Sequence, residues 1–140
     1  MRPPAKERPM QNLMLNLDVP DLDAAIAFYT QAFELVVSRR LFGGTVAELA
    51  GAAAPIYLLA KPAGTRAAGA QTRDYARHWT PLHLDFVVDD IAAAVARAVA
   101  AGATLERAAQ EHDWGVLAVL ADPFGHGFCF VEWRAGYDVV

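Results

Sequence analysis

An imidazole and a carboxylate two positions apart are the first residues of this chain whose types and spacing suggest chemistry. They lie in the segment 83–90, which reads HLDFVVDD and predicts a strand that runs into a helix cap. Because side chains alternate between the two faces of a strand, His83 and Asp85 share one face. The opposite face is apolar and suits packing against a helix; it holds Leu84, Phe86 and Val88. The polar face is therefore a candidate wall of a cleft.

A second carboxylate, Glu132, is the natural partner of His83. Period-two alternation puts Glu132 on the same side of its strand as Phe128 and Phe130, and an unpaired carboxylate in that company is costly to bury. A pair between Glu132 and His83 can act as a structural tie, as a general base or as half of a metal site, and the sequence leaves these three open. Cys129 takes the opposite phase, toward the helix, and is expected to be a buried small hydrophobe rather than a nucleophile.

An earlier segment, 14–21, reads MLNLDVPD and has the same layout. Its polar phase carries Met14, Asn16 and Asp18, which we expect to offer donors and acceptors to a polar ligand. The alternative is that the strand edges are exposed to solvent, so that these groups are hydrated and bind no ligand. Two aromatic residues, Trp114 and Phe130, are candidate walls of the same pocket, although aromatics at strand spacing more often belong to the core.

The bulk composition excludes several classes of function. A chain of 140 residues that is 55% hydrophobic and 20% charged is expected to form one compact domain or two small modules with a shared core. The net charge of −4 and the absence of a basic run make nucleic acid or an anionic membrane an unexpected partner. The first ten residues have no apolar stretch typical of a signal peptide or a membrane span. A single cysteine excludes an internal disulfide framework and fits a reducing compartment, so a cytoplasmic location is expected.

The first half of the chain reads β-α-β-β-β. A strand over 12–19 stops at Pro20, and Asp21 is a good N-cap for a helix over 22–33. Three strands are expected to follow, over 35–41, 45–49 and 55–59. The first two are joined by a tight turn at the glycine pair 43–44.

The second half repeats this order. A strand over 82–88 leads to a helix capped by Asp89 or Asp90, with an apolar stripe that ends before Gly102. The strands that follow are expected at 104–109, 116–120 and 128–133, with a turn of type I at 122–125. Sliding the halves by 69 positions aligns Met14 with His83 and Asp21 with Asp90, which indicates a duplicated module.

This reading divides the chain into five parts. They are a flexible N-terminal tail (1–10), a first βαβββ module (11–60), a linker (61–80), a second βαβββ module (81–134) and a C-terminal tail (135–140). The linker is small and polar, and a short helical turn is expected over 72–79.

Three blocks of residues carry a family resemblance over about 11–134. The first is LDVPD at 17–21 with AFY at 27–29, and the second is His83 with VVDD at 87–90. The third and most specific is WG at 114–115 with DPFGHGF at 122–128 and Glu132. These blocks resemble the vicinal oxygen chelate superfamily, which includes glyoxalase I, extradiol dioxygenases, fosfomycin-resistance enzymes and bleomycin-binding proteins. The resemblance implies an α+β fold in which two βαβββ modules form a curled mixed sheet around a cleft, and it implies a homodimer.

Enzymes of that superfamily hold a divalent metal with side chains from four places, which the resemblance puts at Met14, about Ala60, His83 and Glu132. His83 and Glu132 suit a borderline metal such as Zn²⁺, Mn²⁺, Ni²⁺ or Fe²⁺. A methionine thioether is a poor ligand for these ions, and an alanine cannot ligate. Asp18 or Asp85 is a possible replacement for a lost ligand. We therefore expect no metal, or a weakly held one.

Two functions of different class follow. The first is a protein that binds a small organic molecule in a cleft without a complete metal site, as the bleomycin-binding members do. The second is a metal-dependent lyase, isomerase or dioxygenase in which Glu132 and His83 are the catalytic residues. The empty ligand positions favour the first.

Overall fold

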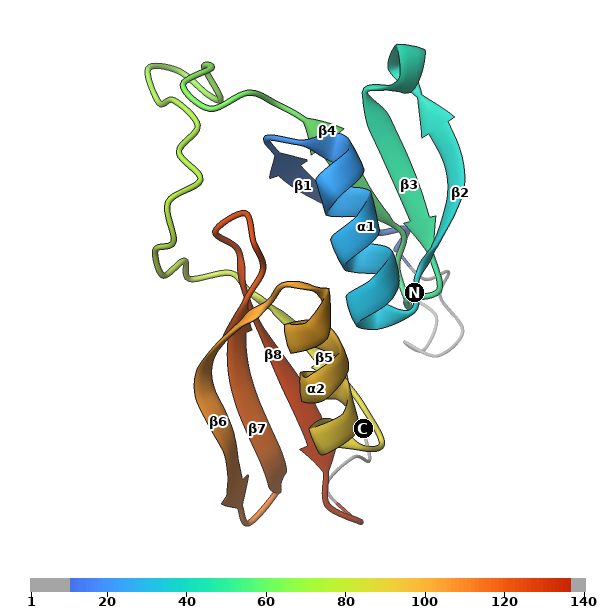
Figure 1. Cartoon of the computed structure of the whole chain (residues 1–140), viewed down its shortest axis with the longest axis vertical. Helices are drawn as coiled ribbons and strands as arrows, with labels where there is room; N and C mark the ends of the chain where they lie inside the picture. The colour runs from blue at the N-terminus through green and yellow to red at the C-terminus, as the bar shows by residue number, and fades with distance from the viewer. Residues whose placement is uncertain (1–10, 137–140) are drawn as a thin grey trace, which may run out of the picture.

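The protein folds into two four-stranded mixed sheets, each with one helix (Figure 1). The structure is a computed structural model that describes residues 11–136. The predicted tail over 1–10 and most of the predicted C-terminal tail lie outside the described residues. Within those residues, no helix is long and apolar enough to cross a membrane. The prediction of an α+β fold built from two βαβββ modules is confirmed, while the exact module boundaries stay a prediction.

The first module has the predicted order. It consists of β1 (Leu15–Val19), α1 (Leu22–Phe33), β2 (Val36–Leu41), β3 (Val46–Ala50) and β4 (Ile56–Ala60), with the short turn η2 (Phe42–Gly44) between β2 and β3. The sheet order is β1-β4-β3-β2, and only the β1–β4 pair is parallel. The glycine pair predicted to make the turn has φ values of 67° and 89°, which favour glycine.

The second module repeats this topology. It consists of β5 (Leu84–Val87), α2 (Ile91–Ala101), β6 (Thr104–His112), β7 (Gly115–Ala121) and β8 (Gly127–Trp133). The sheet order is β5-β8-β7-β6, so β8 lies between two strands, as β4 does in the first sheet. Strand β6 extends to His112, three residues beyond the predicted end.

The two helices begin at equivalent aspartates. The Asp21 carboxylate accepts a hydrogen bond from the Ala24 N–H, and the Asp90 carboxylate accepts one from the Ala93 N–H, both at 3.1 Å. These bonds satisfy N–H groups that a helix leaves free in its first turn. Gly102 ends α2 with a φ of 122°. The predicted caps of both helices are confirmed.

A single hydrophobic core joins the two modules. The helices α1 and α2 pack against each other (Figure 1), and aromatic side chains of α1 reach those of the second sheet. The Phe33 ring stacks on Phe86 with a centroid distance of 4.0 Å, and the Phe28 ring lies 6.4 Å from Phe128. Aromatic pairs of this kind contribute about 0.5–1.5 kcal/mol beyond their buried area. The modules are therefore held together by more than the connection between them.

The phase predicted for β5 agrees with the structure, but the phase predicted for β8 was wrong. Strand β5 pairs with β8 in a register that sets Asp85 beside Cys129 and Phe86 beside Phe130. Because paired residues share a face, Cys129 lies on the polar side of the sheet, while Phe130 is buried in the core under α1. We call the side away from α2 the open face of the second sheet; it carries Asp85, Leu117, Val119, Cys129 and Val131.

The connection from β4 to β5 is irregular, and the helical turn predicted over 72–79 is absent. Its second part, residues 73–83, which we call the strap, is bound to both modules. The Arg73 guanidinium donates to the Asp18 carboxylate at 2.8 Å. The Arg77 guanidinium donates to both carboxylate oxygens of Glu106, at 2.8 and 2.9 Å. The strap therefore crosses from β1 to β6 and ends at His83.

Candidate functional site

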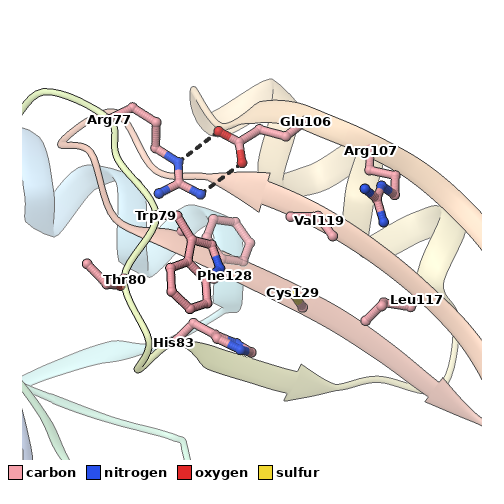
Figure 2. A pocket seen from close by; sticks show the side chains of 11 residues that line it. Arg77, Trp79, Thr80, His83, Glu106, Arg107, Leu117, Val119, Phe128 and Cys129 are labelled. Atoms are coloured by element: carbon pink, nitrogen blue, oxygen red, sulfur yellow. Dashed lines mark hydrogen bonds and ion pairs between the residues drawn. The ribbon is translucent and has the colours of Figure 1, made fainter.

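The open face of the second sheet and the strap enclose a cavity of about 410 Å³ (Figure 2). We call it the open-face cavity. Its lining residues come from the strap, β6, β7 and β8: Arg77, Trp79, Thr80, His83, Glu106, Arg107, Leu117, Val119, Gly127, Phe128 and Cys129. The volume is in the range of sites that bind small molecules, and a mainly apolar wall with a few polar groups is typical of such sites.

Three potential metal ligands meet beside this cavity. The Nδ1 atom of His83 lies 2.8 Å from Oδ1 of Asp85, and one ligand atom each of His83, Asp85 and Cys129 lies within 4.8 Å of the other two. The residues come together because β5 and β8 are adjacent and Asp85 pairs with Cys129. Burial raises the pKa of the Cys129 thiol to about 11, and the Asp85 carboxylate acts in the same direction. The thiol is therefore protonated at neutral pH.

This donor set fits a divalent metal. A tetrahedral ion with bonds of about 2.0–2.3 Å needs ligand atoms roughly 3.5 Å apart, and three protein ligands are what a catalytic zinc site uses. His83, Asp85 and Cys129 would hold the ion, and when bound it would act as a Lewis acid on substrate oxygens. The sequence had offered Asp85 only as a replacement ligand and had left Cys129 out.

Glu132 lies far from His83, so the predicted Glu132–His83 pair does not form. In the parallel register, Glu132 continues β8 beyond Val131, whereas His83 precedes Leu84 at the other end of β5. His83 therefore lies at the level of Gly127, five residues before Glu132 on β8, so the two side chains are about 16 Å apart along the strand direction. The Glu132 carboxylate instead accepts a hydrogen bond from the Ile91 N–H at 3.1 Å. Its position is structural, at the first turn of α2.

Two predicted aromatic walls also lie elsewhere. Phe130 is 1% exposed and belongs to the hydrophobic core. Trp114 lies in the turn between β6 and β7, where its ring stacks on His112 at 5.1 Å. Because Gly115 pairs with Trp133 and Ala121 with Gly127, this turn is at the opposite end of the sheet from His83. Neither residue reaches the open-face cavity.

The residues at and before β1 that were predicted to face the cleft line a second cavity, which has walls from both modules. Met14, Asn16 and Asp18 share this space of about 630 Å³ with His83 and the strap. Asp18 is paired with Arg73 there, as described above. His83 thus lines both cavities, and Met14 and Asn16 line the second one from the first module.

Several cavity residues were missed in the sequence. Arg107 faces the cavity because of an irregularity in β6, which no sequence pattern indicated. Arg77 lies so close to Gly127 that a Cβ there would come within 2.5 Å of its Nη2 atom. The phase of Cys129 was missed because Phe128, Cys129, Phe130 and Val131 form a continuous apolar run that is buried on both faces.

The first sheet carries a separate polar network on the side away from α1. The Tyr57 hydroxyl donates to the Glu48 carboxylate, which also accepts from the Ser38 hydroxyl at 2.6 Å and from Arg39 at 3.2 Å. These hydrogen bonds, that of Ser38 first, lower the pKa of Glu48 to about 2. The network lies across β2, β3 and β4 and fixes their side chains on that face.

Comparisons with known proteins agree on one fold. A family model described as a glyoxalase-like domain matches residues 14–131. An uncharacterised protein of Mycobacterium bovis is 33% identical over 129 residues, which cover 89% of this chain and 81% of that protein. Among solved structures, a genomically encoded fosfomycin resistance protein from Listeria monocytogenes has a TM-score of 0.71 at 15% identity, covering 94% of this chain and 100% of its own. An antibiotic binding protein from a Streptomyces species has a TM-score of 0.63 at 20% identity, covering 89% and 97%.

Proposed function

The chain belongs to the glyoxalase-like domain family, and from this premise we propose that it binds a small organic molecule in the open-face cavity. The cavity carries the proposal, because it combines an apolar floor, an exposed tryptophan and several polar groups around its edge. Leu117 and Val119 of the open face supply the apolar surface, and His83 supplies a hydrogen-bonding group. Solved relatives of this fold include a protein described as antibiotic binding, which supports the same class of function here.

A thermal-shift screen tests this proposal. The screen uses aromatic acids and their amides, glutathione conjugates and antibiotics. A ligand at a hundredfold excess over its Kd should stabilise the fold by about 2.7 kcal/mol, because it binds only the folded state. The variant Val119→Trp places a large ring in the open-face cavity, so it should abolish the shift caused by any hit.

The matched control is Val36→Trp, on the edge strand β2, where the valine is 61% exposed and lies outside the cavity. This variant should keep the shift of the wild type. A hit that stabilises Val119→Trp as strongly as the wild type binds elsewhere, and it would contradict the proposal.

We also propose that a homodimer completes the site. Every residue that lines the open-face cavity belongs to 77–129, so the first module contributes no wall to it within one chain. A second copy can supply the missing side with its own first sheet. Sedimentation should give a particle of twice the 15.1 kDa chain mass, and a monomer at micromolar concentration would contradict the dimer.

The second candidate is a metal-dependent lyase, isomerase or dioxygenase. One observation favours it, the cluster of His83, Asp85 and Cys129. Against it, the His83 and Asp85 side chains are 44% and 41% exposed, so water competes for the same positions. A weakly held ion or none therefore fits the binding function better.

Metal analysis separates the two candidates. Protein purified without an affinity tag should carry clearly less than one Zn²⁺, Mn²⁺, Ni²⁺ or Fe²⁺ per chain if the cavity only binds a ligand. One metal per chain that is lost in both His83→Ala and Cys129→Ser would contradict the metal-free binding function and favour the enzyme candidate instead. The variant His112→Ala is the control, because His112 stacks on Trp114 at the far end of the sheet.

A cytoplasmic location is part of the proposal. The single cysteine, Cys129, is a buried free thiol, which a reducing compartment keeps in that state. Detection in a cytosolic fraction by an antibody would test it.

A further inference from the structure

We propose that the ligand of the open-face cavity is an organic acid, with a single carboxylate on an apolar body, and that Arg107 binds the carboxylate. The inference rests on the proposed function, since it names the class of molecule that the same cavity takes. Three observations support it: the unpaired guanidinium of Arg107, the β-bulge in β6 that directs this side chain into the cavity, and the apolar side chains of the cavity wall.

Arg107 lines the cavity, and its guanidinium forms no ion pair with the other described residues. Arg77 also lines the cavity, but both of its donors that face Glu106 are bound at 2.8 and 2.9 Å, and a third donates to the His78 carbonyl. Within residues 11–136, by contrast, no hydrogen bond or ion pair joins the Arg107 guanidinium to another residue. Since Arg77 and Glu106 offset each other, the lining keeps a formal charge of +1 at Arg107.

A β-bulge in β6 turns Arg107 toward the cavity. Leu105 pairs with Leu120, and Arg107 pairs with Val119, so two steps on β6 correspond to one step on β7. Without the extra residue, Arg107 would pair with Ala118 and lie on the side that faces α2. Bulges commonly redirect a side chain in this way beside functional sites. In Figure 2 the guanidinium of Arg107 points toward Val119 and Leu117.

The remaining walls suit an apolar body. Leu117 and Val119 of the open face form the floor beneath Arg107, and Trp79 of the strap is 74% exposed at the side of the cavity. An aromatic ring can cover this surface while its acid group reaches the guanidinium.

A carboxylate fits this cation better than a phosphate does. The planar guanidinium fork matches both groups, but a phosphate monoester carries close to two negative charges at neutral pH. Among the described residues that line the cavity, Arg107 is the one cation without an ion pair, so a second negative charge on the ligand would have no partner there. One arginine therefore selects one carboxylate.

The experiment compares matched acids and amides. Binding of benzoic, 2-naphthoic and indole-3-acetic acids, and of the three corresponding amides, is measured by calorimetry with the wild type, Arg107→Ala, Arg107→Lys and Arg134→Ala. Arg134 is the control, because it is an exposed arginine that does not line the cavity. At least one acid should bind tenfold tighter than its amide, and Arg107→Ala should remove that difference. Arg107→Lys should restore part of it, because lysine keeps the charge and loses the fork.

The outcomes separate the two proposals. If amides bind as well as acids, and Arg107→Ala changes neither, the inference is wrong while a cavity ligand is retained. If no acid or amide binds at millimolar concentration and the wider screen gives no hit, both proposals fail. Salt is a further readout: the Kd of the acid should rise with ionic strength and that of the amide should not.

Discussion

The carboxylate of Glu132 accepts a hydrogen bond from the backbone N–H of Ile91, at 3.1 Å. Ile91 is the first residue of α2, so the carboxylate binds one of the N–H groups that the helix leaves free. A negative charge here also interacts favourably with the positive end of the helix dipole. Asp90 binds the Ala93 N–H in the same turn. Two carboxylates thus fix the start of the helix, and this contact explains why an acidic residue occupies the end of an otherwise apolar strand.

Replacing Glu132 should therefore affect stability and leave ligand binding unchanged. We expect Glu132→Ala to lower the free energy of unfolding by about 1 kcal/mol, the usual cost of a lost helix cap. Glu132→Gln, which keeps an acceptor oxygen, should lose less. Urea denaturation measures both. If a Glu132 variant bound the cavity ligand tenfold more weakly while its free energy of unfolding was unchanged, the structural role would be contradicted. Glu132 would then be a ligand-binding residue.

The parts of the fold that were predicted correctly have strong local signals. The aspartate caps at 21 and 90 precede helices with clear apolar stripes, and both helices begin where predicted. Strand β5 alternates polar and apolar residues, because one of its faces is solvated, so its phase could be read directly.

The errors come from strands without such alternation. Strand β8 has partners on both sides, and Phe128, Cys129, Phe130 and Val131 are all buried. A strand buried on both faces reads as a continuous apolar run, so its pattern does not fix its phase. Glu132 was the only polar guide and belongs to a helix contact. Strand β6 is exposed along its whole length, so the bulge that directs Arg107 left no trace in the hydrophobic pattern.

The buried Asp122 carboxylate should be a major source of stability. It accepts hydrogen bonds from the Tyr29 hydroxyl at 2.5 Å, from the Phe124 and His126 N–H groups, and lies 2.7 Å from Nδ1 of His126. Its side chain is fully buried. Tyr29→Phe removes one donor from this carboxylate and should cost about 1–3 kcal/mol of unfolding free energy.

The contact also links the modules, because Tyr29 lies on α1 and Asp122 follows β7. Burial, and then the Asp122 carboxylate, raise the pKa of Tyr29 well above its usual 10.0, so the hydroxyl stays a donor in mildly alkaline solution. Tyr75→Phe is the control, since the Tyr75 hydroxyl donates to a carbonyl oxygen rather than to a carboxylate. If Tyr29→Phe and Tyr75→Phe lower the free energy of unfolding equally, the hydrogen bond to the buried Asp122 carboxylate is no stronger than an ordinary one.

The Glu48 network predicts an acid-dependent part of the stability. Because the hydrogen bonds of Ser38, Tyr57 and Arg39 lower the pKa of Glu48 from 4.5 to about 2, folding favours the ionised form. The contribution is therefore fully present above pH 4.5 and is lost as the pH falls from 4.5 to 2. Glu48→Gln should be less stable than the wild type at pH 7, and the difference should vanish near pH 2.

Melting temperatures of both proteins across this pH range provide the measurement. Glu111→Gln is the matched control, because Glu111 is an exposed glutamate of β6 whose carboxylate forms no hydrogen bond or ion pair with the other described residues, and its difference from the wild type should not follow this profile. A difference between Glu48→Gln and the wild type that is constant from pH 7 to pH 2 would show that the network does not favour the ionised carboxylate.

The contact between the strap and the turn at 122–127 depends on Gly125. This residue has a φ of 90°, and a Cβ added to it would lie 2.3 Å from the carbonyl oxygen of Tyr75. Gly125→Ala must therefore push the strap away, in addition to the cost of the backbone conformation, which is about 1–3 kcal/mol. We expect lower stability and faster proteolytic cleavage within 73–83.

Gly64→Ala is the control, because Gly64 has a similar φ of 79° with no atom within 4 Å of the added Cβ. It should show the backbone cost alone, with cleavage of the strap as slow as in the wild type. Ligand binding should weaken only in Gly125→Ala, since the strap forms one wall of the open-face cavity. Equal cleavage and equal affinity in the two variants would show that the strap does not depend on this contact.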